Sequence, residues 1–146
     1  MLLLCCLPEE IETSARLLEE LKRLPGPPAL ERVLRTAQLA QRLQQPRPQG
    51  LLCLALLPAR QDLHDLLAMQ HLLQDIPLVL ALPDDAPQTL ALAHRLRARY
   101  LTYMQRPDAH QLMAQVVARV LDKYSRPWEP PAGSGPGPGT PGDDPA

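Results

Sequence analysis

The sequence predicts an α/β fold of the (βα)5 type, with five parallel strands in one doubly wound sheet and helices on both faces. Two observations predict it. Short apolar runs alternate with segments of helical periodicity over residues 1–123, and two of these runs are apolar throughout. A strand that is apolar throughout is typical of the interior of a parallel sheet, where both faces are covered. Right-handed crossovers then give the strand order 2-1-3-4-5.

The first half of the chain supplies two strands and two helices. The apolar run LLLCCL at residues 2–7 predicts the first strand. Apolar residues at helical spacing, with three glutamates at the amino end, predict a helix over residues 9–24. The segment ALERVL at residues 29–34 alternates apolar and polar residues, which is typical of an edge strand. Thr36 can cap a short helix that ends near residue 43.

The second half supplies the two central strands, LLCLALL at residues 51–57 and PLVLAL at residues 77–82. We expect both to be covered on both faces, because neither contains a polar residue. The last strand, YLTYM at residues 100–104, is expected to be partly exposed. The remaining helices are expected at residues 62–73, starting at Asp62, at residues 87–97 and at residues 109–121.

Composition limits the class of protein. Hydrophobic residues make up 45% of the 146 residues, which excludes a wholly disordered chain. The 15 basic and 16 acidic residues give a net charge of -1, so the chain as a whole does not attract nucleic acid. Its three cysteines form no CxxC pair, which favours a reducing cytoplasm. The first apolar run is too short for a signal peptide and no stretch could span a bilayer, so we expect a cytoplasmic protein.

The chain changes character near Tyr124. Residues 124–146 are rich in proline and glycine and are expected to form a disordered tail after a domain at residues 1–123. The large apolar residue of this tail is Trp128, which either packs loosely on the last helix or anchors a partner. The initial Met1 and the tail favour a complete small protein over a fragment.

The end of the fifth strand carries the most specific pattern. In YMQRPDAHQL, Tyr103 is followed by Arg106 and Pro107 ahead of the last helix. This segment resembles the receiver domains of bacterial two-component response regulators, where an aromatic residue precedes a Lys-Pro pair with a cis peptide bond. The segments LLLCCLPEE, LLCLALLP and IPLVLALPDD are similar to the family's first, third and fourth strands. The resemblance covers residues 1–123 and implies the flavodoxin-like strand order of receivers.

The residues that a receiver uses for phosphorylation are missing. The family binds Mg²⁺ through two acidic residues after the first strand and phosphorylates an aspartate ending the third. Mg²⁺ requires oxygen ligands, and phosphoryl transfer requires positioned charge. Here Cys5 and Cys6 stand at the acidic pair, Leu54 or Ala55 at the phosphoacceptor, and Leu82 at the hydroxyl position. The chain therefore resembles a pseudo-receiver, for which we expect no enzymatic activity, no metal and no cofactor.

Only Arg106 keeps the charge of the receiver's lysine. In many receivers the hydroxyl on strand four and the aromatic residue on strand five couple phosphorylation to the output surface. Leu82 removes half of that coupling, so the resemblance implies an output surface held in one state.

Receivers contact their partners mainly through the fourth helix, the fifth strand and the fifth helix. In this chain the region concentrates arginine and tyrosine, the residue types enriched at interface hot spots. The alternative is an ordinary solvated basic helix end. The candidate partner surface consists of Arg95, Arg97, Arg99, Tyr100, Tyr103 and Arg106.

The expected partner is another protein: a signalling kinase, a regulator or a second copy. A homodimer through this surface is one possibility. Head-to-tail association with the glutamates of the first helix is another, although surface charge pairs are individually weak. Nucleic acid is disfavoured as a partner by the net charge and by the absence of a recognition motif.

A second function, from a different class, is a thiol-based redox or metal sensor. The third strand runs beside the first, so Cys53 can approach Cys5 or Cys6, and Arg106 nearby would favour a thiolate. The alternative is that these cysteines act as small apolar core residues. No glycine-rich phosphate loop occurs, which disfavours a nucleotide enzyme.

Overall fold

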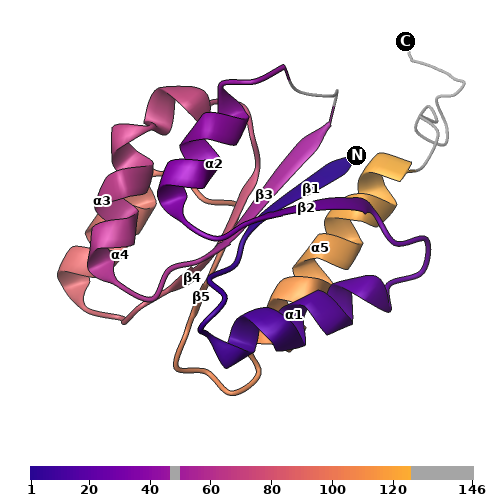
Figure 1. Cartoon of the computed structure of the whole chain (residues 1–146). Helices are drawn as coiled ribbons and strands as arrows, with labels where there is room; N and C mark the ends of the chain where they lie inside the picture. Colours follow the sequence, from indigo (N-terminus) through magenta and orange to yellow (C-terminus); the bar gives the residue numbers. More distant parts are fainter. Residues whose placement is uncertain (47–49, 126–146) are drawn as a thin grey trace, which may run out of the picture.

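The computed structural model describes residues 1–46 and 50–125, with side chains as far as residue 123. Five parallel strands form one sheet in the order β2-β1-β3-β4-β5, which confirms the predicted fold class and strand order (Figure 1). The strands are β1 (Leu2–Cys6), β2 (Ala29–Val33), β3 (Leu51–Leu56), β4 (Leu78–Leu82) and β5 (Tyr100–Tyr103). The helices are α1 (Glu12–Lys22), α2 (Thr36–Leu43), α3 (Arg60–Ala68), α4 (Pro87–Arg95) and α5 (Ala109–Ser125), with a short 3-10 turn η1 (Gln70–Leu72).

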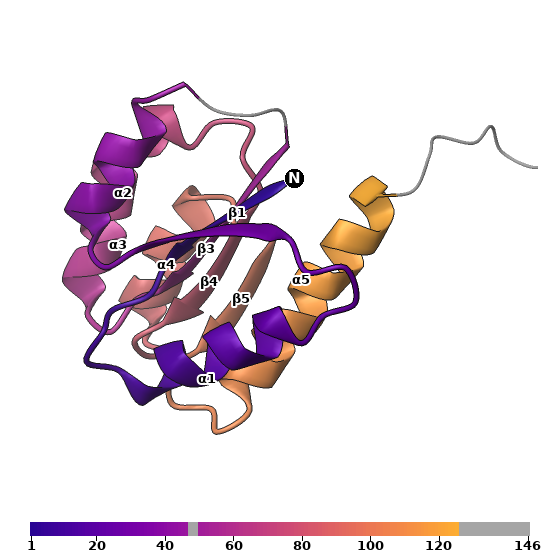
Figure 2. The ribbon, with the colours of Figure 1, turned by 45° about the vertical axis from the view of Figure 1, so that its right-hand side comes forward.

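The helices form two layers, one on each face of the sheet. Helices α1 and α5 cover one face, and α2, α3 and α4 cover the other (Figure 2). Successive strand residues point to opposite faces, so Leu3 and Cys5 pack in the α1–α5 layer while Leu4 and Cys6 pack in the α2–α4 layer. Every residue of β3 and β4 is buried, which confirms their central position. Strand β2 has no fully buried residue, as expected at an edge.

Helices α1 and α4 are shorter than the sequence predicts. Helix α1 begins at Glu12 instead of residue 9, because Pro8 to Ile11 forms a turn in which the Ile11 N–H donates to the Pro8 carbonyl. Helix α4 ends at Arg95, since Arg97 two residues later has a left-handed φ of 57°. Apolar residues continue at helical spacing through both turns, so the sequence pattern predicts longer helices than the structure contains.

The expected cap of α2 is wrong. Arg35 occupies the N-cap position and makes no side-chain cap, while Thr36 lies inside the helix. The Thr36 hydroxyl instead donates to Asp65 of α3 at 3.0 Å, which joins the two neighbouring helices. Helix α3 in turn begins before Asp62, whose carboxylate accepts the Ala59 N–H at 3.0 Å and so closes the first turn.

Helix α5 continues to Ser125, two residues into the segment that the sequence assigns to a tail. The rest of that segment, with Trp128, lies outside the described residues. Within the described ranges, no helix combines the length and the apolar character needed to cross a membrane.

Candidate functional site

The residues that the sequence analysis assigns to a degenerate phosphorylation pocket lie inside the hydrophobic core. Cys5 pairs with Leu54 and Cys6 with Ala55 across β1 and β3. These four residues and Leu82 are each at most 1% exposed. None of the five side chains offers an oxygen atom. At these positions the carboxyl edge of the sheet therefore has neither a Mg²⁺ ligand nor a phosphate acceptor.

The three cysteines do not form one site. Cys5 lies in the α1–α5 layer, whereas Cys6 and Cys53 lie in the α2–α4 layer. Cys53 is in register with Leu4, two residues before Cys6. That offset places the two Cα atoms about 8 Å apart, beyond the reach of a disulfide. Within the described part of the chain, no three His, Cys, Asp or Glu residues are grouped to hold a metal ion.

The thiols are held in their protonated form. Burial in the apolar core raises the pKa of Cys5 and of Cys6 to about 12, and it raises the pKa of Cys53 as well. The cation that opposes this shift at Cys5 is Arg32, not Arg106. The expectation that Arg106 favours a thiolate is therefore wrong, and the geometry does not support a redox or metal sensor.

Arg106 turns away from the pocket. Its side chain is 52% exposed, and its Nε donates to the Asp108 carboxylate at 2.9 Å. A second donor of the same guanidinium reaches the other oxygen of Asp108 at 3.1 Å, so the pair is bidentate. The following Pro107 has a trans peptide bond, unlike the cis bond of the family. Arg106, which stands at the lysine position in the resemblance to receivers, thus pairs with Asp108 just before α5.

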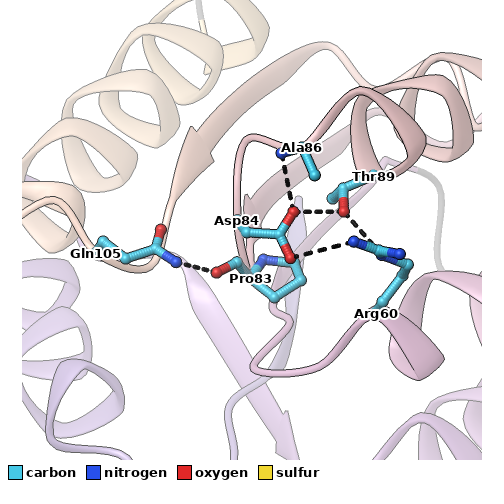
Figure 3. Close-up of polar contacts among 6 residues, drawn as sticks. All are labelled: Arg60, Pro83, Asp84, Ala86, Thr89 and Gln105. Atoms are coloured by element: carbon cyan, nitrogen blue, oxygen red, sulfur yellow. Dashed lines mark hydrogen bonds and ion pairs between the residues drawn. The ribbon is translucent and has the colours of Figure 1, made fainter.

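A polar network ties three loops together at the carboxyl edge of the sheet (Figure 3). One oxygen of Asp84, in the loop after β4, accepts the Ala86 N–H at 3.0 Å and the Thr89 hydroxyl at 2.5 Å. Arg60, at the start of α3, donates to the Thr89 hydroxyl at 3.0 Å and lies 3.7 Å from the other Asp84 oxygen. Gln105, in the loop after β5, donates to the Pro83 carbonyl. We call this set the Asp84 network.

The hydrogen bonds of the Asp84 network favour the ionised carboxylate. The Thr89 hydroxyl, and after it the Ala86 N–H, hold the pKa of Asp84 below its usual range. Sequence reasoning missed this set. The local part was readable, because an aspartate often accepts the backbone N–H two residues further on in a turn, as Asp84 does from Ala86. The contacts of Arg60 and Gln105, 29 and 22 residues from their partners, leave no sequence pattern.

Removal of the central hydroxyl is expected to destabilise the fold. Thr89 is fully buried, and its hydroxyl both donates to Asp84 and accepts from Arg60. Valine keeps the shape but leaves two polar partners unsatisfied, so Thr89→Val should lower the free energy of unfolding by about 1–3 kcal/mol. Urea denaturation measures the change. Thr102→Val is the matched control, because the buried Thr102 hydroxyl has no hydrogen-bond partner among the described residues. An equal effect in both variants would mean that the network does not stabilise the loops.

A small cavity lies where the strand order reverses, between β1 and β3. It has a volume of about 250 Å³, and its lining includes Cys6, Thr36, Asp62 and Asp65. Such switch points often hold ligands in open α/β sheets, but this cavity is below the roughly 300–1,000 Å³ of small-molecule sites. Two of its carboxylates are engaged, Asp62 with the Ala59 N–H and Asp65 with the Thr36 hydroxyl.

The candidate partner surface divides between the two edges of the sheet. Arg95, Arg97 and Arg99 lie at the end of α4 and in the turn to β5, at the amino edge. Arg106 follows β5, at the carboxyl edge. Between them, the half-buried Tyr100 packs in the α1–α5 layer and Tyr103 in the α2–α4 layer. The three amino-edge arginines are therefore grouped apart from the other three residues.

These three arginines line a hollow of about 1220 Å³ at the amino edge of β4 and β5. We call it the basic hollow. One wall is η1 with the connection to β4, and the other is the end of α4 with the turn to β5. The Gln70 side chain joins the walls by donating to the Arg95 carbonyl at 2.7 Å. The lining residues are Gln70, His71, Leu73, Gln74, Asp75, Ile76, Pro77, His94, Arg95, Leu96, Arg97 and Arg99.

Glycine at the left-handed position of the basic hollow is expected to stabilise the fold. Arg97 has a φ of 57° just after the end of α4, where helices usually place glycine. Relief of the left-handed strain exceeds the entropy that glycine adds to the unfolded chain, so Arg97→Gly should raise stability by about 0.5–1 kcal/mol. Ala91→Gly, on the exposed side of α4, should lower it by about 1 kcal/mol. Thermal unfolding of both variants checks the opposite signs.

Comparison with known proteins finds a similar fold but no matching sequence family. No protein-family model and no curated protein matches it. It is similar to the crystal structure of the phosphorylated cyanobacterial phytochrome response regulator RcpA, with a TM-score of 0.58 and 16% sequence identity. The match covers 83% of this chain and 91% of that one. At this identity the likeness concerns the fold. With five parallel strands in the order 2-1-3-4-5 and five helices in two layers, the chain has the receiver fold of response regulators.

Proposed function

We propose that the chain is a non-enzymatic signalling module that binds a partner protein without being phosphorylated. The observation that carries this proposal is the apolar core at the positions of the phosphorylation chemistry. Cys5, Cys6, Leu54, Ala55 and Leu82 are buried. The two thiols are poor Mg²⁺ ligands, and neither Leu54 nor Ala55 can accept a phosphoryl group. In this proposal the chain works in the cytoplasm of a bacterium, as receivers of two-component systems do.

The carboxyl-edge loops support a single, fixed output state. In a receiver, the residue at the Leu82 position and the aromatic residue on β5 move together on phosphorylation. Here Leu82 is in register with Tyr103, and both side chains pack in the α2–α4 layer. The Asp84 network also binds the loop after β4 to Arg60 on one side and Gln105 on the other. These contacts support an output surface that is held in one state without a phosphoryl group.

Phosphorylation independence is tested with a small-molecule phosphodonor. The protein is incubated with acetyl phosphate and Mg²⁺ beside a phosphorylation-competent receiver, and intact masses are compared. We expect the competent receiver to gain a phosphoryl group and this chain to gain none. Stable phosphorylation of any carboxylate at the carboxyl edge would overturn the proposal.

Partner binding is tested by capture from an extract of the native host. The Arg95→Glu/Arg99→Glu variant reverses two of the four arginine charges of the candidate surface, and Arg35→Glu/Arg119→Glu is the control with the same change in net charge. All four side chains are exposed. We expect a partner, such as a kinase or a regulator, to be retained by the wild type and the control and lost by the first variant. Retention by all three proteins would place the interface elsewhere.

A further inference from the structure

Among the described residues, the guanidinium groups in the basic hollow have no close neighbour of opposite charge. In the same part of the chain, five other arginines lie within 4.0 Å of a carboxylate: Arg16, Arg23, Arg42, Arg60 and Arg106. In the part of the chain that the structure describes, Arg95, Arg97 and Arg99 make no such pair and no side-chain hydrogen bond. His71 and His94 lie beside them, and the one carboxylate in the lining is that of Asp75. The hollow thus concentrates uncompensated positive charge on a chain whose net charge is -1.

The backbone of this cluster is fixed although its side chains are free. The Arg95 carbonyl is held by Gln70, and the Arg99 N–H donates to the Leu78 carbonyl at 2.8 Å. The Arg97 N–H donates to the His94 carbonyl at 3.1 Å, in the left-handed turn. Like charges at alternate positions repel one another, and an anion placed between them removes that repulsion. A fixed backbone also lowers the entropy lost when a ligand binds.

The size and the lining of the hollow select the class of ligand. Its volume of about 1220 Å³ exceeds the roughly 300–1,000 Å³ of small-molecule pockets. The lining contains no Tyr, Trp or Phe, so the bases of a single strand would lack the aromatic platforms on which they usually stack. Guanidinium groups, in contrast, bind carboxylates through two parallel hydrogen bonds. These features favour an extended acidic polypeptide over a metabolite or a nucleic acid.

The acidic residues of a second copy are a poorer match. On α1, Glu12 lies 3.0 Å from Arg16, and both Glu19 and Glu20 lie within 4.0 Å of Arg23. Much of that negative charge is therefore already neutralised within each copy. These pairs reduce the charge complementarity of the head-to-tail association, although Glu9 and Glu10 of the same acidic segment are exposed.

We propose that the basic hollow binds an acidic segment, rich in aspartate and glutamate, of a different protein. The inference rests on the proposed function and names the chemistry of its partner. It places the contact at the amino edge of the sheet, opposite the degenerate phosphorylation pocket.

A labelled peptide of ten glutamates is the probe for this proposal. Its binding is followed by fluorescence anisotropy at low and at physiological salt, where screening should weaken it. We expect the wild type and Arg35→Glu/Arg119→Glu to bind equally, and Arg95→Glu/Arg99→Glu to bind roughly tenfold or more weakly. Arg97→Gly should also bind more weakly although it is expected to unfold at a higher temperature, which separates lost charge from lost folding.

Any of the following outcomes would overturn the acidic-segment proposal. The first is equal peptide binding by wild type and Arg95→Glu/Arg99→Glu. The second is tighter binding of a ten-residue oligothymidylate through the same arginines, which would assign the hollow to nucleic acid. The third is a wild-type dimer that Arg95→Glu/Arg99→Glu dissociates, seen by sedimentation, which would assign it to a second copy. If the peptide fails to bind but capture from the extract still depends on Arg95 and Arg99, the acidic ligand is wrong and the proposed function stands.

Discussion

Aspartate at the phosphoacceptor position is expected to destabilise this protein instead of restoring phosphorylation. Leu54 is fully buried in the α1–α5 layer beside Cys5 of β1. A carboxylate placed there has no cation within the core to pair with, since Arg106 is engaged by Asp108 outside the pocket. Arg32 lies beyond β1, two strands from Leu54, and donates to the Leu7 carbonyl. An uncompensated charge in such a site costs about 3–5 kcal/mol, so Leu54→Asp should lose most of its stability in urea. Acetyl phosphate with Mg²⁺ should leave the fraction that remains folded unmodified.

The controls separate charge from shape. Leu54→Met keeps the volume and should cost less than about 1.5 kcal/mol. Ala55→Asp tests the neighbouring position, where Ala55 is also fully buried, and should be as destabilising as Leu54→Asp. A Leu54→Asp protein that stays folded and accepts a phosphoryl group would show that this single substitution restores phosphorylation. That result would contradict the view that the pocket has become part of the core.

The sheet was predictable because its signal is local and redundant. A central strand must bury both faces, so LLCLALL and PLVLAL carry no polar residue, and their order along the chain follows from right-handed crossovers. Helix ends were less predictable, because one turn or one left-handed residue ends a helix without interrupting its apolar period. Arg97 does so after α4, at a position where the sequence offers no glycine.

The candidate site was predictable in composition but not in arrangement. The expected absence of a Mg²⁺ site was visible in Cys5 and Cys6, because their residue types alone show that no carboxylate stands there. Separation of Cys5 from Cys53 depends on which face each side chain occupies, and that requires the strand register. The Asp84 network joins residues from three loops and leaves no periodic signal. Similarly, the run of arginines did not show that Arg106 lies at the opposite edge from Arg95.

All three cysteines are expected to resist thiol reagents in the folded protein and to react together when it unfolds. With the pKa of Cys5 and Cys6 raised to about 12, their thiolate fraction at pH 8 is roughly a thousandfold below that of an exposed thiol. Burial also blocks the reagent itself. A chromogenic disulfide reagent such as DTNB should therefore report almost no reactive thiol in buffer and all three in guanidinium chloride.

The same shifts give a direction to the pH dependence of stability. The folded state favours the protonated thiol, whereas the thiols of the unfolded chain ionise near pH 8.5. The contribution of the thiols is therefore fully present below that pH and is lost as the pH rises above it. Replacing Cys5 and Cys6 with alanine should flatten the fall in stability between pH 8 and 10, measured by urea denaturation at each pH. Rapid labelling of one cysteine in the folded protein, with the other two protected, would instead revive the thiol-sensor function and identify its reactive residue.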